Sequence, residues 1–236
     1  MRQTFIESLM FIHICAGLGC IAAGPAAMLI RPKGGVLHRR YGLWYVRLMA
    51  LLASTAAVLL VFRWNPFFFS LSALSFYLCF SAWRVLLRKR AHILPPEPLQ
   101  RAQGIDWAAA LATIAVGIAS VFLWRGGYFG DQADQAAIVL GTLAFAVIIA
   151  AFDLWRFLYP AALSRYPAAW LIEHLAKMGG SYIAVASAFS GTVLQQFLPI
   201  TFAQTWPAIV GVPIILWVSF RYWLPMRRRA TKAAES

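Results

Sequence analysis

The stretch AAIVLGTLAFAVIIAAFD, residues 136–153, has no charged side chain before its last residue, Asp153. It lies within an apolar span that runs from about 135 to 159. About 20 apolar residues allow an α-helix to cross the roughly 30 Å hydrocarbon core of a bilayer. Because backbone groups in lipid have no water to bind, such a span must satisfy them internally as a helix. The stretch therefore predicts a transmembrane helix with an acid inside it.

Six further apolar spans of similar length lie on either side, separated by Pro, Gly or Asn. The seven predicted spans cover residues 4–30, 41–62, 66–88, 106–124, 135–159, 170–198 and 206–224. The predicted fold is therefore all-α: a polytopic integral membrane protein with a seven-transmembrane-helix bundle. Residues 1–225 are expected to form this single membrane domain, and residues 226–236 a basic cytoplasmic tail.

Composition supports a membrane protein. The 236 residues are 61% hydrophobic and only 12% charged, whereas a soluble domain carries roughly 25% charged residues. The net charge of +13 raises the question of nucleic-acid binding. However, Lys and Arg lie at the ends of the apolar spans, as topology determinants do. We therefore predict a lipid bilayer as the environment and no nucleic-acid partner.

The positive charges also predict an orientation. Of the 21 Lys and Arg residues, all but Arg2, Arg63 and Arg125 flank one side of the predicted bundle. Cytoplasmic loops carry the excess of Lys and Arg. The N-terminus is therefore expected outside and the C-terminus in the cytoplasm.

His13 lies on a face of small residues in the first span. Gly17, Cys20 and Gly24 follow it at helical spacing, and small residues on one face let a neighbouring helix approach closely. We expect the imidazole to lie in that helix contact. Two interpretations remain open for it: a hydrogen-bonded packing residue, or a ligand for heme or metal or a proton relay.

Charged side chains gather at the predicted cytoplasmic ends of the spans, and such residues are costly to bury in lipid. Besides Asp153, which requires a cationic partner, they include Arg39, Arg47, Arg84, Asp106 and Glu173. Arg47 and Arg84 are the candidate partners of Asp153. The cluster is interpreted either as an ion-pair lattice at helix ends or as a binding site. Such a site would suit an anion, a lipid headgroup, a heme propionate or a quinone.

Two histidines at this end are candidate ligands for heme b or a metal ion. His38 and His174 lie near the starts of two spans on the same side, and neutral imidazoles ligate metals. Met178 follows His174 on one helical face and is a further candidate. His13 belongs to the outer half of its span, so its depth conflicts with a single site containing all three histidines.

Several motifs resemble those of a known family. Two of them contain histidine: Leu37-His38-Arg39-Arg40-x-Gly42 and His174-Leu175-x-x-Met178-x-x-Ser181-Tyr182. The others are His13-Ile14-x-Ala16-Gly17, Ala23-Gly24-Pro25-Ala26, Asn65-Pro66-Phe67, Asp106-Trp107, Asp153-Leu154-Trp155-Arg156 and Trp206-Pro207. Together they resemble a family of bacterial multi-spanning membrane proteins catalogued only as a domain of unknown function.

The resemblance covers most of the chain, with one departure at Ser187, where a threonine is expected. It implies location in the bacterial inner membrane. It also implies that His13, His38, Arg39, Asp153 and His174 matter beyond topology, but it implies no reaction.

The residues leave several functions open. The first is a redox or metal-handling membrane protein with histidine-bound heme b or metal. The second is a transporter or a protein that binds a lipid, quinone or other small molecule. A third is an intramembrane metal-dependent hydrolase built from His13, His38, His174 and Asp153. The last is an assembly subunit without chemistry. Whether the chain is an enzyme, and its oligomeric state, stay undecided at this level.

Overall fold

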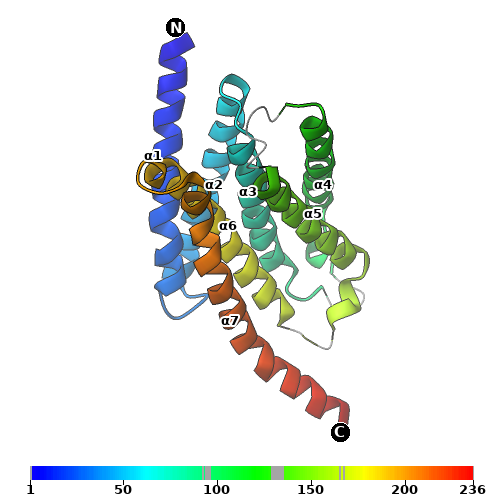
Figure 1. Ribbon diagram of the computed structural model, residues 1–236. Helices are drawn as coiled ribbons and strands as arrows, with labels where there is room; N and C mark the ends of the chain where they lie inside the picture. Colours follow the sequence, from blue (N-terminus) through cyan, green and yellow to red (C-terminus); the bar gives the residue numbers. More distant parts are fainter. Residues whose placement is uncertain are drawn as a thin grey trace.

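The computed structural model describes residues 2–91, 93, 97–128, 136–164, 166 and 168–235, and within these residues every regular element is helical. Seven α-helices follow one another, joined by short loops and 3-10 turns (Figure 1). Their bounds are α1 Arg2–Leu29, α2 Val36–Phe62, α3 Pro66–Val85, α4 Gly104–Arg125, α5 Ala136–Leu158, α6 Ala169–Val193 and α7 Ile200–Glu235. Each predicted span corresponds to one of these helices.

Six of the seven helices are long and apolar enough to cross a bilayer. The exception is α6, whose first turns carry three ionisable residues, Glu173, His174 and Lys177. The all-helical fold is therefore confirmed for the described residues, and the six long apolar helices indicate a lipid bilayer as the environment. Crossing by α6 and the direction of the N-terminus stay predictions.

Several helix boundaries differ from those expected. α6 ends at Val193 rather than near 198, and α7 begins at Ile200 rather than near 206. α2 begins at Val36 rather than near 41, so His38 lies in its first turn. α7 continues to Glu235, through Pro225, and so includes the backbone of the predicted tail. Proline ends a helix in most contexts, but Pro207 and Pro213 also lie within this same helix.

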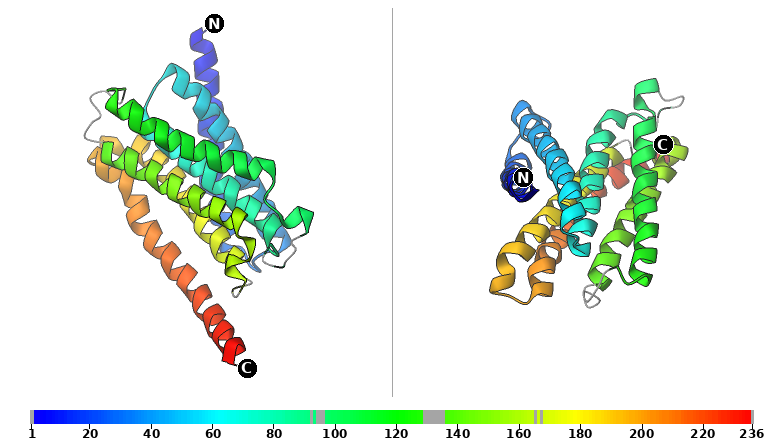
Figure 2. Two further views of the ribbon diagram at one scale, coloured as in Figure 1. Left: turned by 90° about the vertical axis from the view of Figure 1, so that its right-hand side faces the viewer. Right: turned by 90° about the horizontal axis from the view of Figure 1, so that it is seen from above.

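The helices pack as neighbours in sequence around α3. The pairs α1–α2, α4–α5 and α6–α7 lie side by side, and α3 also contacts α2, α4, α5 and α6. In Figure 2, α1 and α2 lie on one side of α3, and α4 and α5 on the other. α3 is accordingly the most deeply buried of the candidate membrane spans.

The connections α1–α2, α3–α4 and α5–α6 all lie at one end of the bundle (Figure 1). We call this the polar end, because it contains the ion pairs described below. At the opposite end, Asn65 accepts a hydrogen bond from the amide of Phe68 at 3.1 Å and caps α3. Pro66 follows as the first helical residue, where its missing N–H has no cost.

Candidate functional site

His38 is held by the turn that reverses the chain between α1 and α2. Gly34 adopts φ +76° there, a backbone conformation that favours glycine, and the amide of Gly35 donates to the carbonyl of Pro32 at 3.0 Å. The turn places the first turn of α2 against the end of α1. Nδ1 of His38 is 2.9 Å from the carbonyl oxygen of Ala27.

His174 is held in the same way by a different helix. Its Nδ1 is 3.0 Å from the carbonyl oxygen of Ala82 on α3. A carbonyl oxygen only accepts hydrogen bonds, so both His38 and His174 must donate through Nδ1–H. In a neutral imidazole, Nε2 then carries a lone pair. A backbone carbonyl on Nδ1–H is also the arrangement that orients metal-bound histidines.

A hydrogen bond deeper in the bundle sets the register of the two histidine helices. Tyr45 of α2 and Ser181 of α6 are joined by their hydroxyls at 2.8 Å. Tyr45 lies seven residues after His38, and Ser181 seven residues after His174. Both helices start at the polar end (Figure 1), and seven residues are about two helical turns. His38 and His174 therefore lie at about the same level of the bundle.

The other two candidate ligands have separate surroundings. Nδ1 of His13 is 2.9 Å from Oγ1 of Thr55, and that hydroxyl donates in turn to backbone carbonyls of α2. Thr55 lies 17 residues beyond His38, which is about 25 Å along the helix. Met178 packs against the buried cluster that contains Tyr45 and Met49. The depth conflict expected for His13 is thus present.

The four residues required for a metal-dependent hydrolase, His13, His38, His174 and Asp153, do not lie together in one site. In the part of the chain that the structure describes, no group of three or more His, Cys, Asp or Glu side chains is placed to hold a metal ion. Asp153 belongs to α5, which lies on the other side of α3 from α2 (Figure 2). Its partners there are Tyr77, Ser81 and Lys177.

Asp153 is the centre of a buried polar group at the polar end. Its side chain is 1% exposed and forms an ion pair with Lys177 of α6. Tyr77 and Ser81, one turn apart on α3, also donate to it at 2.7 and 2.5 Å. The expectation that Arg47 or Arg84 would pair with Asp153 is wrong. α6 packs against α3 beside α5 and brings Lys177 there instead.

Arg84 has a different acid as its partner. Its Nε and Nη2 donate to the two carboxylate oxygens of Asp106 at 2.8 Å each, a bidentate pair. Asp106 also accepts from the backbone N–H of Gln103 as part of a capping box at the start of α4. This pair ties the end of α3 to the beginning of α4.

The remaining charged candidates lie nearer the surface. Glu173 accepts from Nε of Arg156 at 3.3 Å and lies 3.9 Å from Lys177. Arg39 and Arg47 are exposed on α2, and Arg47 lies 6.0 Å from the ring of Trp44. Of the predicted polar cluster, the structure thus brings together Arg84, Asp106, Asp153 and Glu173 but not the two α2 arginines.

Sequence reasoning included Arg84 of α3 in the polar cluster but missed Tyr77, Ser81 and Arg88 on the same helix. Tyr77, Ser81, Arg84 and Arg88 recur at four, three and four residues, which is one helical face. That polar stripe in an apolar helix was a readable signal. Lys177 had one too, because it follows Glu173 by four residues inside a predicted span.

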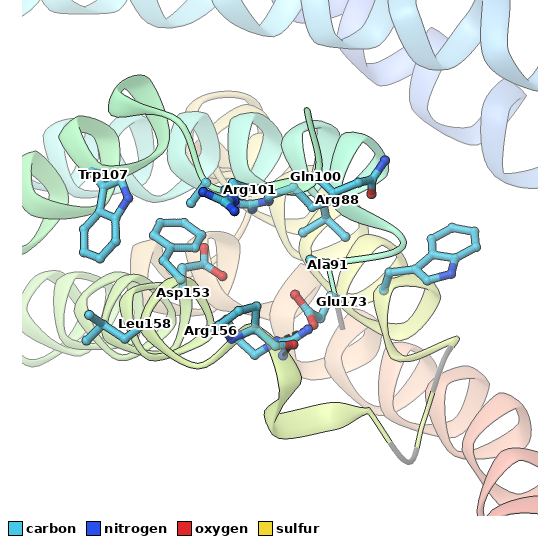
Figure 3. Close-up of a pocket in the computed structure, with 14 residues that line it drawn as sticks. Arg88, Ala91, Gln100, Arg101, Trp107, Asp153, Arg156, Leu158 and Glu173 are labelled. Atoms are coloured by element: carbon cyan, nitrogen blue, oxygen red, sulfur yellow. Dashed lines mark hydrogen bonds and ion pairs between the residues drawn. The ribbon is translucent and has the colours of Figure 1, made fainter. Parts of the chain in front are cut away.

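A pocket of about 310 Å³ opens beside this group. Figure 3 shows Arg88 and Arg101 on one wall, with Arg156 and Glu173 on the wall opposite. The two walls come from the α3–α4 connection and from the facing ends of α5 and α6. Its aromatic lining consists of Trp107, Phe157 and Trp170.

Comparisons with known proteins add no identity. No family model, no curated protein and no solved structure matches the chain.

Proposed function

We propose that the chain is a membrane redox protein in which His38 and His174 are the axial ligands of heme b. The observation that carries the proposal is the pair of Nδ1–H bonds to the carbonyls of Ala27 and Ala82. They leave Nε2 of each ring as the ligating nitrogen. Heme b in a helix bundle takes ligands from facing helices, and these two imidazoles come from different helices at one level.

The surroundings of the two rings fit the other parts of a heme. Met178 and Tyr182 provide partly buried apolar surface deeper in the bundle. Cations lie toward the polar end: Arg39 follows His38 directly, and the ammonium of Lys89 lies 4.4 Å from the centre of the Trp170 ring, one helical turn before His174. A heme has an apolar macrocycle and two carboxylates. In this proposal the macrocycle packs against the deeper apolar surface, and the two carboxylates pair with the cations.

The finer topology belongs to the same proposal. We infer that α6 is a seventh span, because its 25 residues reach about 37 Å and lie between α3 and α7. The excess of Lys and Arg at the polar end supports a cytoplasmic location for that end and an outer location for the N-terminus. The family resemblance supports the bacterial inner membrane.

Absorption spectroscopy tests the proposal. The protein is produced in a host supplied with a heme precursor and purified in detergent. We expect a Soret band that shifts on reduction with dithionite and disappears in both His38→Ala and His174→Ala. His13→Ala is the matched control, since it removes a hydrogen-bonded imidazole of α1 whose partner, Thr55, lies about 25 Å from His38 along α2, and it is expected to keep the band.

Two outcomes would contradict heme ligation by this pair. One is a colourless protein that stays colourless after hemin is added to the purified chain. The other is a Soret band that survives both single substitutions at His38 and His174.

A further inference from the structure

Arg88 is a buried cation with one guanidinium nitrogen that no neighbouring acceptor binds. It lies in the 3-10 turn Leu86–Arg88 that ends α3, and its side chain is only 10% exposed. Its Nη1 is 3.6 Å from Oδ1 of Asp106, which is too far for a hydrogen bond. This nitrogen has no hydrogen-bond partner among the described residues. A buried guanidinium nitrogen without an acceptor costs free energy.

The other charges at this end are already paired. Asp106 is bound in bidentate fashion by Arg84, Asp153 is bound by Lys177, and Glu173 is bound by Arg156. Arg88 is therefore a fourth cation beside three carboxylates. The pocket thus has a surplus of positive charge, which favours an anion.

The geometry around Arg88 directs that charge into the pocket. The guanidinium lies 4.5 Å from the centre of the Phe157 ring, and a cation over an aromatic face is held in place by it. Arg88 and Phe157 both line the pocket, whose volume of about 310 Å³ lies at the lower end of the range for small-molecule sites.

One wall of the pocket continues onto the apolar outer surface of the bundle. Leu158 lines the pocket and is 62% exposed. Together with Trp155 and Tyr159, it also lines a shallower groove next to the pocket. Both neighbours are exposed on the outer surface of α5 and the residue after it. A ligand with its anionic group at Arg88 can therefore lay a hydrocarbon chain along this groove in the bilayer.

We propose that this pocket binds the phosphate headgroup of an anionic membrane lipid. Nη1 of Arg88 donates to a phosphate oxygen, and the acyl chains lie along Trp155 and Leu158. Guanidinium–phosphate hydrogen bonds are charge-assisted and strong in a partly dry site. The site is separate from the histidine pair, since neither His38 nor His174 lines the pocket.

Titration of the purified full-length protein in an uncharged detergent tests the site. The probes are a short-chain phosphatidic acid, a diacylglycerol with the same chains, and inorganic phosphate. We expect the phosphatidic acid to bind at least about tenfold more tightly than either other probe, because only it has both the charge and the chains. Arg88→Gln is expected to weaken its binding by about tenfold or more.

Two further variants complete the test. Ala102→Trp fills the pocket and keeps every ion pair, so it tests the site even if Arg88→Gln unfolds the protein, and it too is expected to abolish tight binding. Arg47→Gln removes an exposed arginine outside the pocket and is expected to leave the affinity unchanged. Helical circular dichroism and size-exclusion chromatography report whether each variant is folded.

Three results would overturn the proposal. Equal affinity for the diacylglycerol would show that the charge is not recognised. Equal affinity for inorganic phosphate would assign the site to a free anion instead of a lipid. Unchanged binding of phosphatidic acid by folded Arg88→Gln or Ala102→Trp would place the lipid elsewhere.

Discussion

At the scale of single residues, the burial of the charged side chains of Asp153 and Lys177 carries a free-energy cost for the bundle. The exposures of the two side chains are 1% and 5%, and a charge in the bilayer region is unfavourable unless it is paired and hydrogen-bonded. Tyr77 and Ser81 supply the additional donors to the carboxylate. The free energy of the pair therefore depends on both partners being present.

This dependence is testable by a double-mutant cycle. Lys177→Met leaves the buried carboxylate without its cation, and Asp153→Asn leaves the buried ammonium with only the more distant Glu173, 3.9 Å away. Each single change is expected to lower the free energy of unfolding by about 3–5 kcal/mol. The double variant, which buries no net charge, is expected to lose less than either one. Denaturant titration in mixed micelles measures all three.

Arg39→Gln is the control for that cycle, because Arg39 is exposed in the first turn of α2 and its loss should change stability by less than about 0.5 kcal/mol. If the single losses at Asp153 and Lys177 simply add in the double variant, the two residues do not act as a pair.

At the scale of helices, α1 approaches α6 closely at Gly24. A Cβ at Gly24 would lie 2.5 Å from Cδ2 of Tyr182 and 2.8 Å from Cε2, closer than atoms tolerate. The face of small residues that begins at His13 thus continues to a real helix contact. The aromatic ring of Tyr182 occupies the space that glycine leaves.

Gly24→Ala is therefore expected to cost about 1–3 kcal/mol in the free energy of unfolding, since the ring or the helix must move. Gly42→Ala on α2 is the matched control. No atom lies within 4 Å of its added Cβ, so we expect a gain of up to about 1 kcal/mol from helix propensity. Chemical denaturation of the two variants side by side measures both signs.

A compensating change separates crowding from other effects at Gly24. Tyr182→Ala removes the obstructing ring, so in its presence Gly24→Ala should cost much less. An equal cost with and without the ring would show that close approach is not the reason for glycine at this position.

At the scale of the whole molecule, the polar groups are concentrated at one end of an otherwise apolar bundle. There Arg84–Asp106 ties α3 to α4, and Lys177–Asp153 and Arg156–Glu173 tie α5 to α6. The hydrogen bonds of Tyr77 and Ser81 to Asp153 join α3 to α5. Both proposed sites adjoin this end, on different sides of α3. The arrangement keeps charged groups near water and leaves the remaining helix length for lipid.

This arrangement predicts the accessibility of the loops. Single cysteines are introduced in a cysteine-free background at Gln196, after α6, and at Ser164, before it. If α6 crosses the bilayer with the polar end in the cytoplasm, a membrane-impermeant thiol reagent added to intact cells labels position 196 and not position 164. Labelling of both positions from one side would mean that α6 does not cross. Labelling of position 164 alone would invert the orientation.

The sequence by itself determined the helical fold and the approximate residue range of each helix. Runs such as 136–152 admit no other structure in lipid, because only a helix satisfies its own backbone hydrogen bonds there. Helix ends were less predictable. Pro225 suggested the end of a span, but α7 continues through it to Glu235.

Only the tertiary structure decided which partners the polar residues have. The sequence shows that Asp153 needs a cationic partner. It does not show which Lys or Arg at the polar end is that partner, because this depends on how the helices pack. Packing of α6 against α3 supplies Lys177, and packing of α4 gives Arg84 to Asp106. The level shared by His38 and His174 likewise rests on the contact between Tyr45 and Ser181. Local sequence patterns determine which side chains of a helix must be buried, whereas helix packing determines which residues they contact.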